Sequence, residues 1–315
     1  MPWASRAANC RNFATKAFPE DQALSARWNL GELYAASEQF AKAAKQLDSG
    51  LKQLKKPDSE HYFLLANVHL RLKHPQKAAA YLQKAIANKS RSDESWYRML
   101  AALYYEAGQY QDGVRVLQQL IAKFPPNKDY WLQLVGLYQQ MKRYDRALAA
   151  NELAYQAGLL TKPMEILNFA NLLSYQDAPY RAAELLEKEI GAGRLPGSWA
   201  NWEKVANAWT QAREFERAIH ALKKASDLHP TGELDYRLGQ IHVEQESWPQ
   251  AYDHLANALR RGNLKYPGEA YLLFGIACYE LERQQEARGA FVNAQKYPKT
   301  RNSGRQWLSY LNSES

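Results

Sequence analysis

Histidine and cysteine most often carry metal or nucleophilic chemistry in proteins, and their spacing in this sequence favours neither. No two histidines recur at the paired helical spacing of a metal site; they are His61, His69, His74, His220, His229, His242 and His254. The two cysteines, Cys10 and Cys278, lie far apart in the chain. The sequence also has no glycine-rich phosphate loop and no nucleophile elbow. We therefore predict no metal, no cofactor and no enzyme activity.

Amide and aromatic side chains at regular intervals are the remaining candidates for recognising a ligand. Amides pair with both the donors and the acceptors of a peptide backbone, and rings contact its side chains. We predict that a protein or peptide partner binds in a groove formed by Trp28, Phe63, Asn67, Arg98, Tyr105, Asn171, Tyr175, Asn207, Tyr236 and Tyr279. Packing across the groove is an equal alternative for its aromatic members.

A repeated helix–turn–helix pattern would bring these side chains to one face. Each unit has a small residue at position 8, a large one at 11, an aromatic near 17, alanine at 20 and a bulky residue at 24. In the sixth unit these are Ala206, Trp209, Phe215, Ala218 and Leu222. We expect the two helices to cross closely where positions 8 and 20 meet, which requires small side chains at both.

Eight units fit this pattern, with steps of 33 to 36 residues between successive residues at position 20, which are Ala43, Ala78, Gly113, Ala147, Ala182, Ala218, Ala251 and Ala287. Pentatricopeptide RNA-binding proteins share a period near ~35, so the period alone leaves that class open. The residue grammar, however, resembles the tetratricopeptide repeat. That resemblance implies an all-α fold, a right-handed superhelical α-solenoid of about eight repeats in which the first helices line the concave face.

The ends of the chain do not follow the repeat pattern. Residues 1–23 are predicted to be an N-terminal segment or partial cap, and residues 24–301 the solenoid. Residues 302–315 are predicted to form a C-terminal capping helix that lays Trp307, Leu308 and Leu311 on the eighth repeat. No linker-like segment interrupts the chain, so we expect one continuous domain.

The positive charge is concentrated in the N-terminal part of the chain. The net charge is +8 over 315 residues, and counting gives 19 Lys+Arg against 12 Asp+Glu in residues 1–130 but 22 against 21 in residues 131–315. The basic residues include Lys42, Lys45, Lys52, Lys55 and Lys56. A solvated outer helix face explains such a cluster, and a nucleic-acid or anionic-surface binder is the alternative function.

No run of about 18 apolar residues is present, so we predict no transmembrane segment. The first ten residues lack the apolar core of a signal peptide. From this the protein is either cytoplasmic, or its natural N-terminus is missing from the sequence.

The part of the chain from the fourth repeat onward resembles a narrower group. The segments that carry this likeness are Asn127–Leu134, Lys162–Leu173, Ala178–Ala183, Leu185–Ile190 and Ala208–Glu214. They are similar to the periplasmic tetratricopeptide proteins encoded beside TonB/ExbB/ExbD-type energy-transduction systems of Gram-negative bacteria. The resemblance covers about residues 20–312. It implies a non-catalytic periplasmic scaffold for a transport complex, with components of that complex as partners and no nucleic acid.

Overall fold

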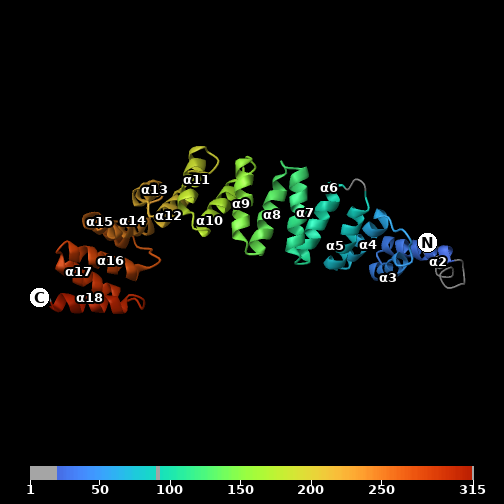
Figure 1. Cartoon of the computed structure of the whole chain (residues 1–315). Helices are drawn as coiled ribbons and strands as arrows, with labels where there is room; N and C mark the ends of the chain where they lie inside the picture. Colours follow the sequence, from blue (N-terminus) through green and yellow to red (C-terminus); the bar gives the residue numbers. More distant parts are fainter. Residues whose placement is uncertain (1–19, 90–92, 314–315) are drawn as a thin grey trace. The chain divides into compact units, whose positions relative to one another are not determined.

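The chain is built from helices throughout the part that the structure describes. The computed structural model describes residues 20–89 and 93–313, and these contain seventeen helices and no strand (Figure 1). The helices are α2 (Glu20–Ala36), α3 (Phe40–Leu51), α4 (Ser59–Arg71), α5 (Pro75–Ala87), α6 (Glu94–Glu106), α7 (Tyr110–Lys123), α8 (Lys128–Gln140), α9 (Tyr144–Gln156), α10 (Pro163–Tyr175), α11 (Pro179–Gly191), α12 (Trp199–Gln211), α13 (Phe215–Leu228), α14 (Gly232–Glu244), α15 (Trp248–Arg261), α16 (Pro267–Glu280), α17 (Gln284–Ala294) and α18 (Arg301–Ser313).

These helices pair into eight hairpins, which confirms the predicted all-α solenoid of eight repeats. The chain divides into two compact units, one ending at Leu159 and the other beginning at Leu160. In the first unit, four hairpins run from α2/α3 to α8/α9, and each helix contacts the next along the chain. In the second unit, four hairpins run from α10/α11 to α16/α17, and α18 follows them.

The turn inside every hairpin has the same backbone conformation. One residue per repeat, always at position 15, has a positive φ between 53° and 71°, and these residues are Glu38, Lys73, Gly108, Lys142, Asp177, Arg213, Glu246 and Glu282. A non-glycine residue adopts this left-handed conformation only at a cost, so its recurrence shows that packing of the two helices fixes the turn. The eight turns thus fit the eight-repeat register independently of the side-chain pattern.

Several first helices begin at a side-chain cap. The Asp58 carboxylate accepts hydrogen bonds from the backbone amides of Glu60 and His61 at the start of α4, both at 3.0 Å. Thr231 accepts from the amide of Leu234 at the start of α14, at 3.2 Å. Such caps satisfy amides that have no partner within the helix, and each contributes about 1 kcal/mol.

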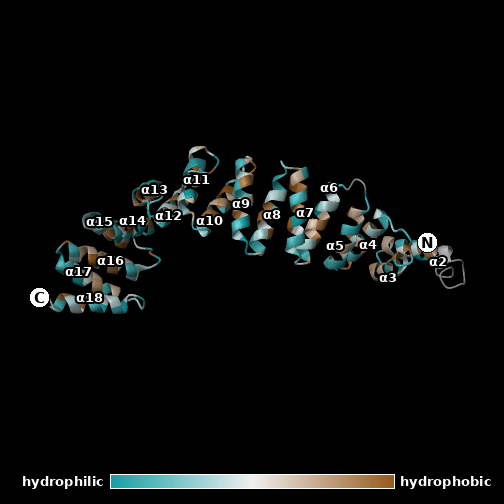
Figure 2. Cartoon of the chain, viewed as in Figure 1, coloured by the Kyte–Doolittle hydropathy of each residue, from teal (hydrophilic) through white to brown (hydrophobic). Residues whose placement is uncertain are grey.

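The core of each repeat consists of the residues that the pattern predicts. The alanines at position 20 are all fully buried, and Tyr34, Tyr104, Tyr138 and Trp209 at position 11 are at most 7% exposed. Hydrophobic and hydrophilic segments alternate along the helices in Figure 2, as expected where each helix buries one stripe of its surface.

The close approach between the paired helices involves position 24 in addition to position 20. A Cβ atom on Gly31, at position 8, would lie 2.6 Å from Leu47, which occupies position 24 rather than 20. At Gly275 the same atom would lie 2.5 Å from Phe291, again at position 24. The small residue at position 8 is therefore needed because a bulky side chain one turn beyond the alanine fills the space of the missing Cβ.

The last helix packs on the eighth repeat as a cap. The Trp307 ring stacks on Phe291 at 5.2 Å between centroids, and Leu311 is 1% exposed. At the other end, α2 begins at Glu20, inside the segment predicted to precede the repeats. The rest of that segment, residues 1–19, lies outside the described residues.

Candidate interaction surfaces

In the first unit, two of the predicted groove residues belong to the packing between repeats. Trp28 is 9% exposed, and its ring lies 4.5 Å from that of His61 on α4 of the next repeat, while its indole N–H donates to Glu32 at 3.0 Å. The Phe63 ring stacks on Trp96 with 4.4 Å between centroids and 8° between planes. Asn67 is half-buried. Arg98 and Tyr105 are exposed, the latter by 51%.

The second unit shows the same division between packed rings and exposed polar groups. Tyr236 is 3% exposed, and its hydroxyl donates to Glu269 at 3.3 Å. Burial, followed by the Glu269 carboxylate, raises the pKa of this phenol, which keeps it a donor. The Tyr279 ring lies 5.5 Å from Trp307 of α18. Three further predicted groove residues, Asn171, Tyr175 and Asn207, are exposed.

The second unit has a cavity of about 490 Å³ between the first helices of repeats six and seven. Its walls come from α12 and α14, with Leu222 of α13; the lining residues are Ala206, Asn207, Thr210, Gln211, Leu222, Arg237, Gln240, Ile241 and Glu244. Asn207 is the predicted groove residue that lines this cavity. Two further amide side chains line the same cavity, Gln211 of α12 and Gln240 of α14.

The polar groups of this cavity are partly engaged with one another. Arg237 donates to the carbonyl oxygen of Asn207 and forms an ion pair with Glu203 at 3.1 Å. Gln240 donates to the Tyr236 hydroxyl at 2.9 Å. The Asn207 amide nitrogen and the Gln240 carbonyl oxygen therefore stay available, one as a donor and one as an acceptor. That combination matches the two polar groups of a peptide backbone.

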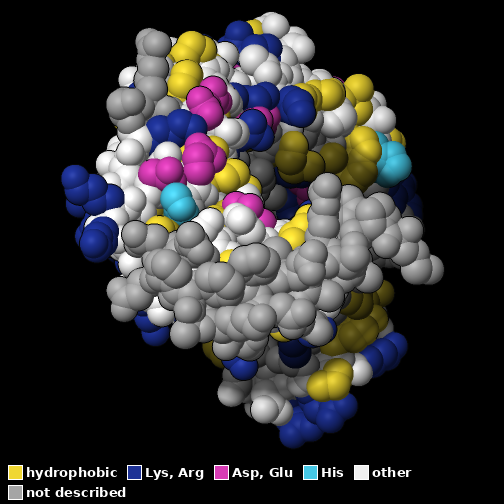
Figure 3. All heavy atoms as spheres, turned by 90° about the vertical axis from the view of Figure 1, so that its right-hand side faces the viewer, with side chains coloured by type: hydrophobic (Ala, Val, Ile, Leu, Met, Phe, Trp, Pro, Cys, Tyr) yellow, Lys and Arg dark blue, Asp and Glu magenta, His cyan; other side chains and the backbone are white. Residues whose placement is uncertain are grey.

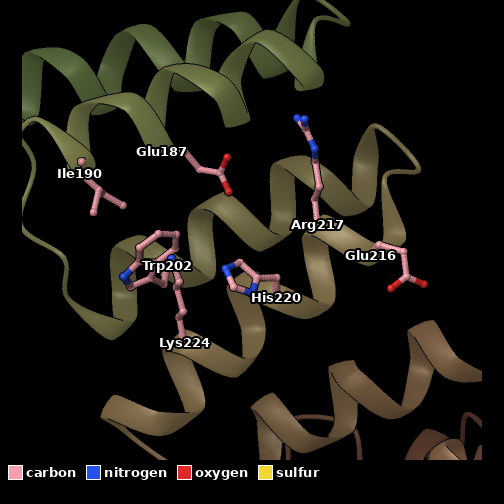
Figure 4. A pocket seen from close by; sticks show the side chains of 8 residues that line it. Glu187, Ile190, Trp202, Glu216, Arg217, His220 and Lys224 are labelled. Carbon is pink, nitrogen blue, oxygen red and sulfur yellow. The ribbon is translucent and has the colours of Figure 1, made fainter.

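A second cavity, of about 590 Å³, lies between the second helices of repeats five and six (Figure 4). It is lined by Glu187, Ile190, Gly191, Trp202, Glu216, Arg217, His220 and Lys224. Sequence reasoning missed this site because it considered only the first helices as ligand-facing. A signal was present: Arg217, His220 and Lys224 recur at intervals of three and four residues, so they share one face of α13.

Metal and thiol chemistry have little basis in the described structure. Within residues 20–89 and 93–313, no three His, Cys, Asp or Glu side chains are placed to hold a metal ion. Cys278 is fully buried, and burial, followed by the nearby Glu286, raises the pKa of its thiol to about 12. A thiol in this state is a poor nucleophile. Cys10 lies outside the described residues. Among the described helices, none has the length and apolarity needed to span a membrane.

Comparison with protein families identifies the repeat. Two family models, both described as tetratricopeptide repeat, match this chain, one over residues 104–154 and the other over residues 29–93 and 236–299. The chain is a tetratricopeptide repeat protein. The repeat period had left the pentatricopeptide class open, and both family models favour the tetratricopeptide repeat instead.

The curated relatives share this repeat over part of their length. The chain is 28% identical over 116 residues to BBSome complex member BBS4 of Mus musculus, covering 36% of this chain and 22% of that protein. It is 25% identical over 160 residues to the Bos taurus protein of the same name, covering 46% of this chain and 30% of the relative. The chain thus spans less than a third of the length of these relatives.

Solved structures also match this chain, with TM-scores below 0.5. The C-terminal part of a tetratricopeptide repeat protein from Cytophaga hutchinsonii has a TM-score of 0.48 and 12% identity, over 77% of this chain and 98% of that one. MamA has a TM-score of 0.46 and 20% identity, over 54% of this chain and 90% of its own. The likeness to TonB-associated proteins stays a prediction.

Proposed function

We propose that this tetratricopeptide protein is a non-catalytic scaffold that binds an extended segment of a partner protein between α12 and α14. The cavity of about 490 Å³ between those helices carries the proposal. Tetratricopeptide proteins generally mediate protein–protein interactions, which agrees with such a role. A segment in extended conformation exposes its backbone N–H and C=O groups; the Gln240 carbonyl oxygen can accept from the N–H and the Asn207 amide nitrogen can donate to the C=O.

The binding role of the cavity is tested by removing its two amides together. In the double variant Asn207→Ala, Gln240→Ala, groups of the partner backbone lose their hydrogen bonds, at about 1–3 kcal/mol per site. We expect the dissociation constant to rise by about tenfold or more, with circular dichroism and melting unchanged. The control is Asn257→Ala, on α15. Equal affinity for the double variant and the control would contradict the proposal.

The partner is identified by placing a photo-crosslinking amino acid at Gln211, inside the cavity. The matched position is Gln250, an exposed residue of α15. The proposal requires a crosslinked product from Gln211 and none of the same mass from Gln250. Following the sequence resemblance, we propose that the partner is a component of a TonB/ExbB/ExbD-type complex and that the protein works in the periplasm. Crosslinking in intact Gram-negative cells, followed by cell fractionation and mass spectrometry, tests both points.

The basic outer surface of the first unit supports a second candidate function, binding to an anionic surface or nucleic acid. Four exposed lysines, Lys42, Lys45, Lys77 and Lys84, lie on α3 and α5. The acidic residue of these two helices, Asp48, is engaged by Tyr81 and His69. On the face shown in Figure 3, Lys and Arg side chains protrude at the margin.

A salt titration separates the two functions. Binding through phosphates weakens steeply as salt rises, whereas binding through amides and aromatic rings changes little. Charge reversal of Lys42 and Lys45 should leave binding of the protein partner intact. Loss of that partner in the lysine variants, together with intact binding in the Asn207/Gln240 variant, would place the interaction on the basic surface instead.

A further inference from the structure

The cavity between α11 and α13 has two chemically different ends. Figure 4 shows Trp202, His220 and Lys224 gathered near Ile190 at one end, while Glu216 lies at the other. The first end combines an apolar wall with basic side chains, and the Glu187 carboxylate lies between this end and Arg217. It can therefore receive both an apolar group and an anion.

The basic groups at this end have no anionic partner in the described structure. The Lys224 ammonium lies over the Trp202 ring, 4.1 Å from its centroid, and forms no ion pair with the described residues. The carboxylates of the same cavity are engaged by neutral donors instead. Glu187 accepts from the Trp209 indole at 3.1 Å, and Glu216 accepts from the Gln245 amide at 3.1 Å. The lysine is thus held in place by an aromatic face while its charge stays available.

Gly191 keeps this end of the cavity open. It is the last residue of α11, and a Cβ atom built on it would meet no atom within 4 Å. Its φ is not positive, so neither backbone conformation nor packing within the chain requires glycine there. A larger side chain at this position would enter the cavity without displacing the protein's own groups.

We propose that this cavity is a second binding site, which takes an acidic amphipathic segment of a partner protein. A carboxylate of the segment pairs with Lys224, and a neighbouring apolar side chain contacts Ile190 and Trp202. Charge complementarity selects this occupant, because the Lys224 ammonium has no ion-pair partner among the described residues, while the Glu187 carboxylate already accepts from the Trp209 indole. The site goes beyond the function proposed above, since it is formed mainly by second helices of the repeats.

The test is selection of random peptides displayed on phage. Peptides that bind the wild-type chain are passed over immobilised Gly191→Met protein, which removes those that do not need the cavity. We expect the remaining peptides to combine Asp or Glu with a nearby Leu, Ile or Phe. A synthetic peptide of the selected sequence should lose on the order of tenfold or more in affinity on Lys224→Glu, because like charges then face each other.

Matched variants make the result specific to this cavity. Gly289→Met is the control for filling, because Gly289 is also a helical glycine whose added Cβ meets no atom within 4 Å. Lys223→Glu is the control for charge, since Lys223 is the exposed neighbour that does not line the cavity. Both controls should bind the peptide as the wild type does. The Asn207→Ala, Gln240→Ala variant should do so too, which separates this site from the cavity between α12 and α14.

Three outcomes would overturn the proposal. Every selected peptide binds Gly191→Met as well as the wild type, or the peptides that fail to bind Gly191→Met are basic or indifferent to Lys224→Glu, or the cavity mediates association between two copies of this chain. Sedimentation of the wild type and of Gly191→Met identifies the third. If Gly191→Met proves less stable than the wild type, the peptide affinity of Lys224→Glu still tests the site, because that variant changes the charge without filling the cavity.

Discussion

Repeats two and seven place a histidine at the same position, yet they surround it with different polar neighbours. His69 and His242 both occupy position 11, where most other repeats have an aromatic residue. Each ring stacks on a ring at position 23 of its own repeat, His69 on Tyr81 at 5.4 Å and His242 on His254 at 5.5 Å. The packing geometry is shared, so the two sites differ in what lies around the stacked pair.

In repeat two, a carboxylate of the preceding repeat holds the pair together. Asp48 of α3 accepts a hydrogen bond from the Tyr81 hydroxyl at 2.7 Å, and its oxygens lie 3.3 Å from Nε2 of His69. His69 is 2% exposed. The carboxylate thus joins two side chains of repeat two to repeat one, and it raises the pKa of the Tyr81 hydroxyl in addition to the effect of burial.

In repeat seven, no carboxylate joins the two rings. The Nδ1 atoms of His242 and His254 are buried without a hydrogen-bond partner in the described structure. Asp235 lies 3.6 Å from His254 Nδ1, beyond hydrogen-bond distance, and 3.1 Å from an Arg261 nitrogen. The pKa of His242 is lowered by burial, then by His254 and Lys223, while Glu216 opposes the shift. The repeat position therefore determines how a ring packs, and the neighbours determine which polar contacts the ring makes.

The largest effect should come from Asp48→Ala in repeat two. This change leaves the buried Nε2 of His69 and the Tyr81 hydroxyl without their acceptor, at about 2–3 kcal/mol, as for hydrogen bonds to a charged group. Hydrogen exchange of the α4 and α5 amides measures the loss locally. The control is Asp253→Ala, on an exposed part of α15 in repeat seven, where we expect a change within about 0.5 kcal/mol. Equal effects of the two changes would mean that the Asp48 contacts contribute nothing.

A smaller effect should appear in repeat seven when the pH is lowered. With a folded pKa below the ordinary 6.5, His242 prefers its neutral form in the folded chain. As the pH falls below 6.5, the unfolded chain binds a proton that the folded chain does not, so stability decreases until the folded pKa is reached. Hydrogen exchange of α14 and α15 against pH measures this loss. Water screens the half-buried ring, so the loss should be smaller than that from Asp48→Ala.

The variant His242→Phe shows which group causes the pH effect. It keeps an aromatic ring at position 11 and removes the titrating group, so the exchange of α14 should depend less on pH. The other groups near the ring, Asp235, Lys223, Glu216 and His254, remain in this variant. An unchanged pH profile would assign the effect to one of them and would remove the electrostatic contrast between the two repeats.

The sequence predicted the repeats well because their pattern is dictated by packing. Tyr34, Trp209 and the position-20 alanines are buried wherever the register placed them. The pattern could not show that Gly31 makes room for Leu47, because a sequence does not tell which of two large residues lies over a missing Cβ. Similarly, the positive φ at position 15 could not be predicted from residue type, because that position is occupied by Glu, Lys, Asp, Arg or Gly in different repeats.

The binding surfaces were predicted less fully than the repeats. Of the predicted groove residues, Asn207 is exposed and lines a cavity, whereas Trp28 and Tyr236 are buried. Exposure depends on the neighbouring helix, which a single-helix register does not include. The site between α11 and α13 requires side chains from three helices, so it emerges only after they are packed. Binding by any of these residues stays a prediction.

The smallest effect should be equal in the two repeats and so serves as their common reference. Lys73 and Glu246 occupy the turns of repeats two and seven with φ of 57° and 55°. The next residue closes each turn in the same way. The backbone amide of His74 donates to the backbone carbonyl of His69 at 3.0 Å, and that of Ser247 donates to the backbone carbonyl of His242 at 2.8 Å. A non-glycine residue in this conformation costs about 1–2 kcal/mol of stability, which glycine avoids. Glycine also increases the conformational entropy of the unfolded chain, and this offsets part of the stabilisation. Lys73→Gly and Glu246→Gly should therefore each stabilise their repeat by about 0.5 kcal/mol in the same hydrogen-exchange measurement. Gly108→Ala, at the equivalent turn of repeat three, should destabilise it by about 1 kcal/mol. Because backbone strain is independent of the charges around His69 and His242, unequal effects of the two glycine variants would show that the repeats differ in backbone as well as in electrostatics.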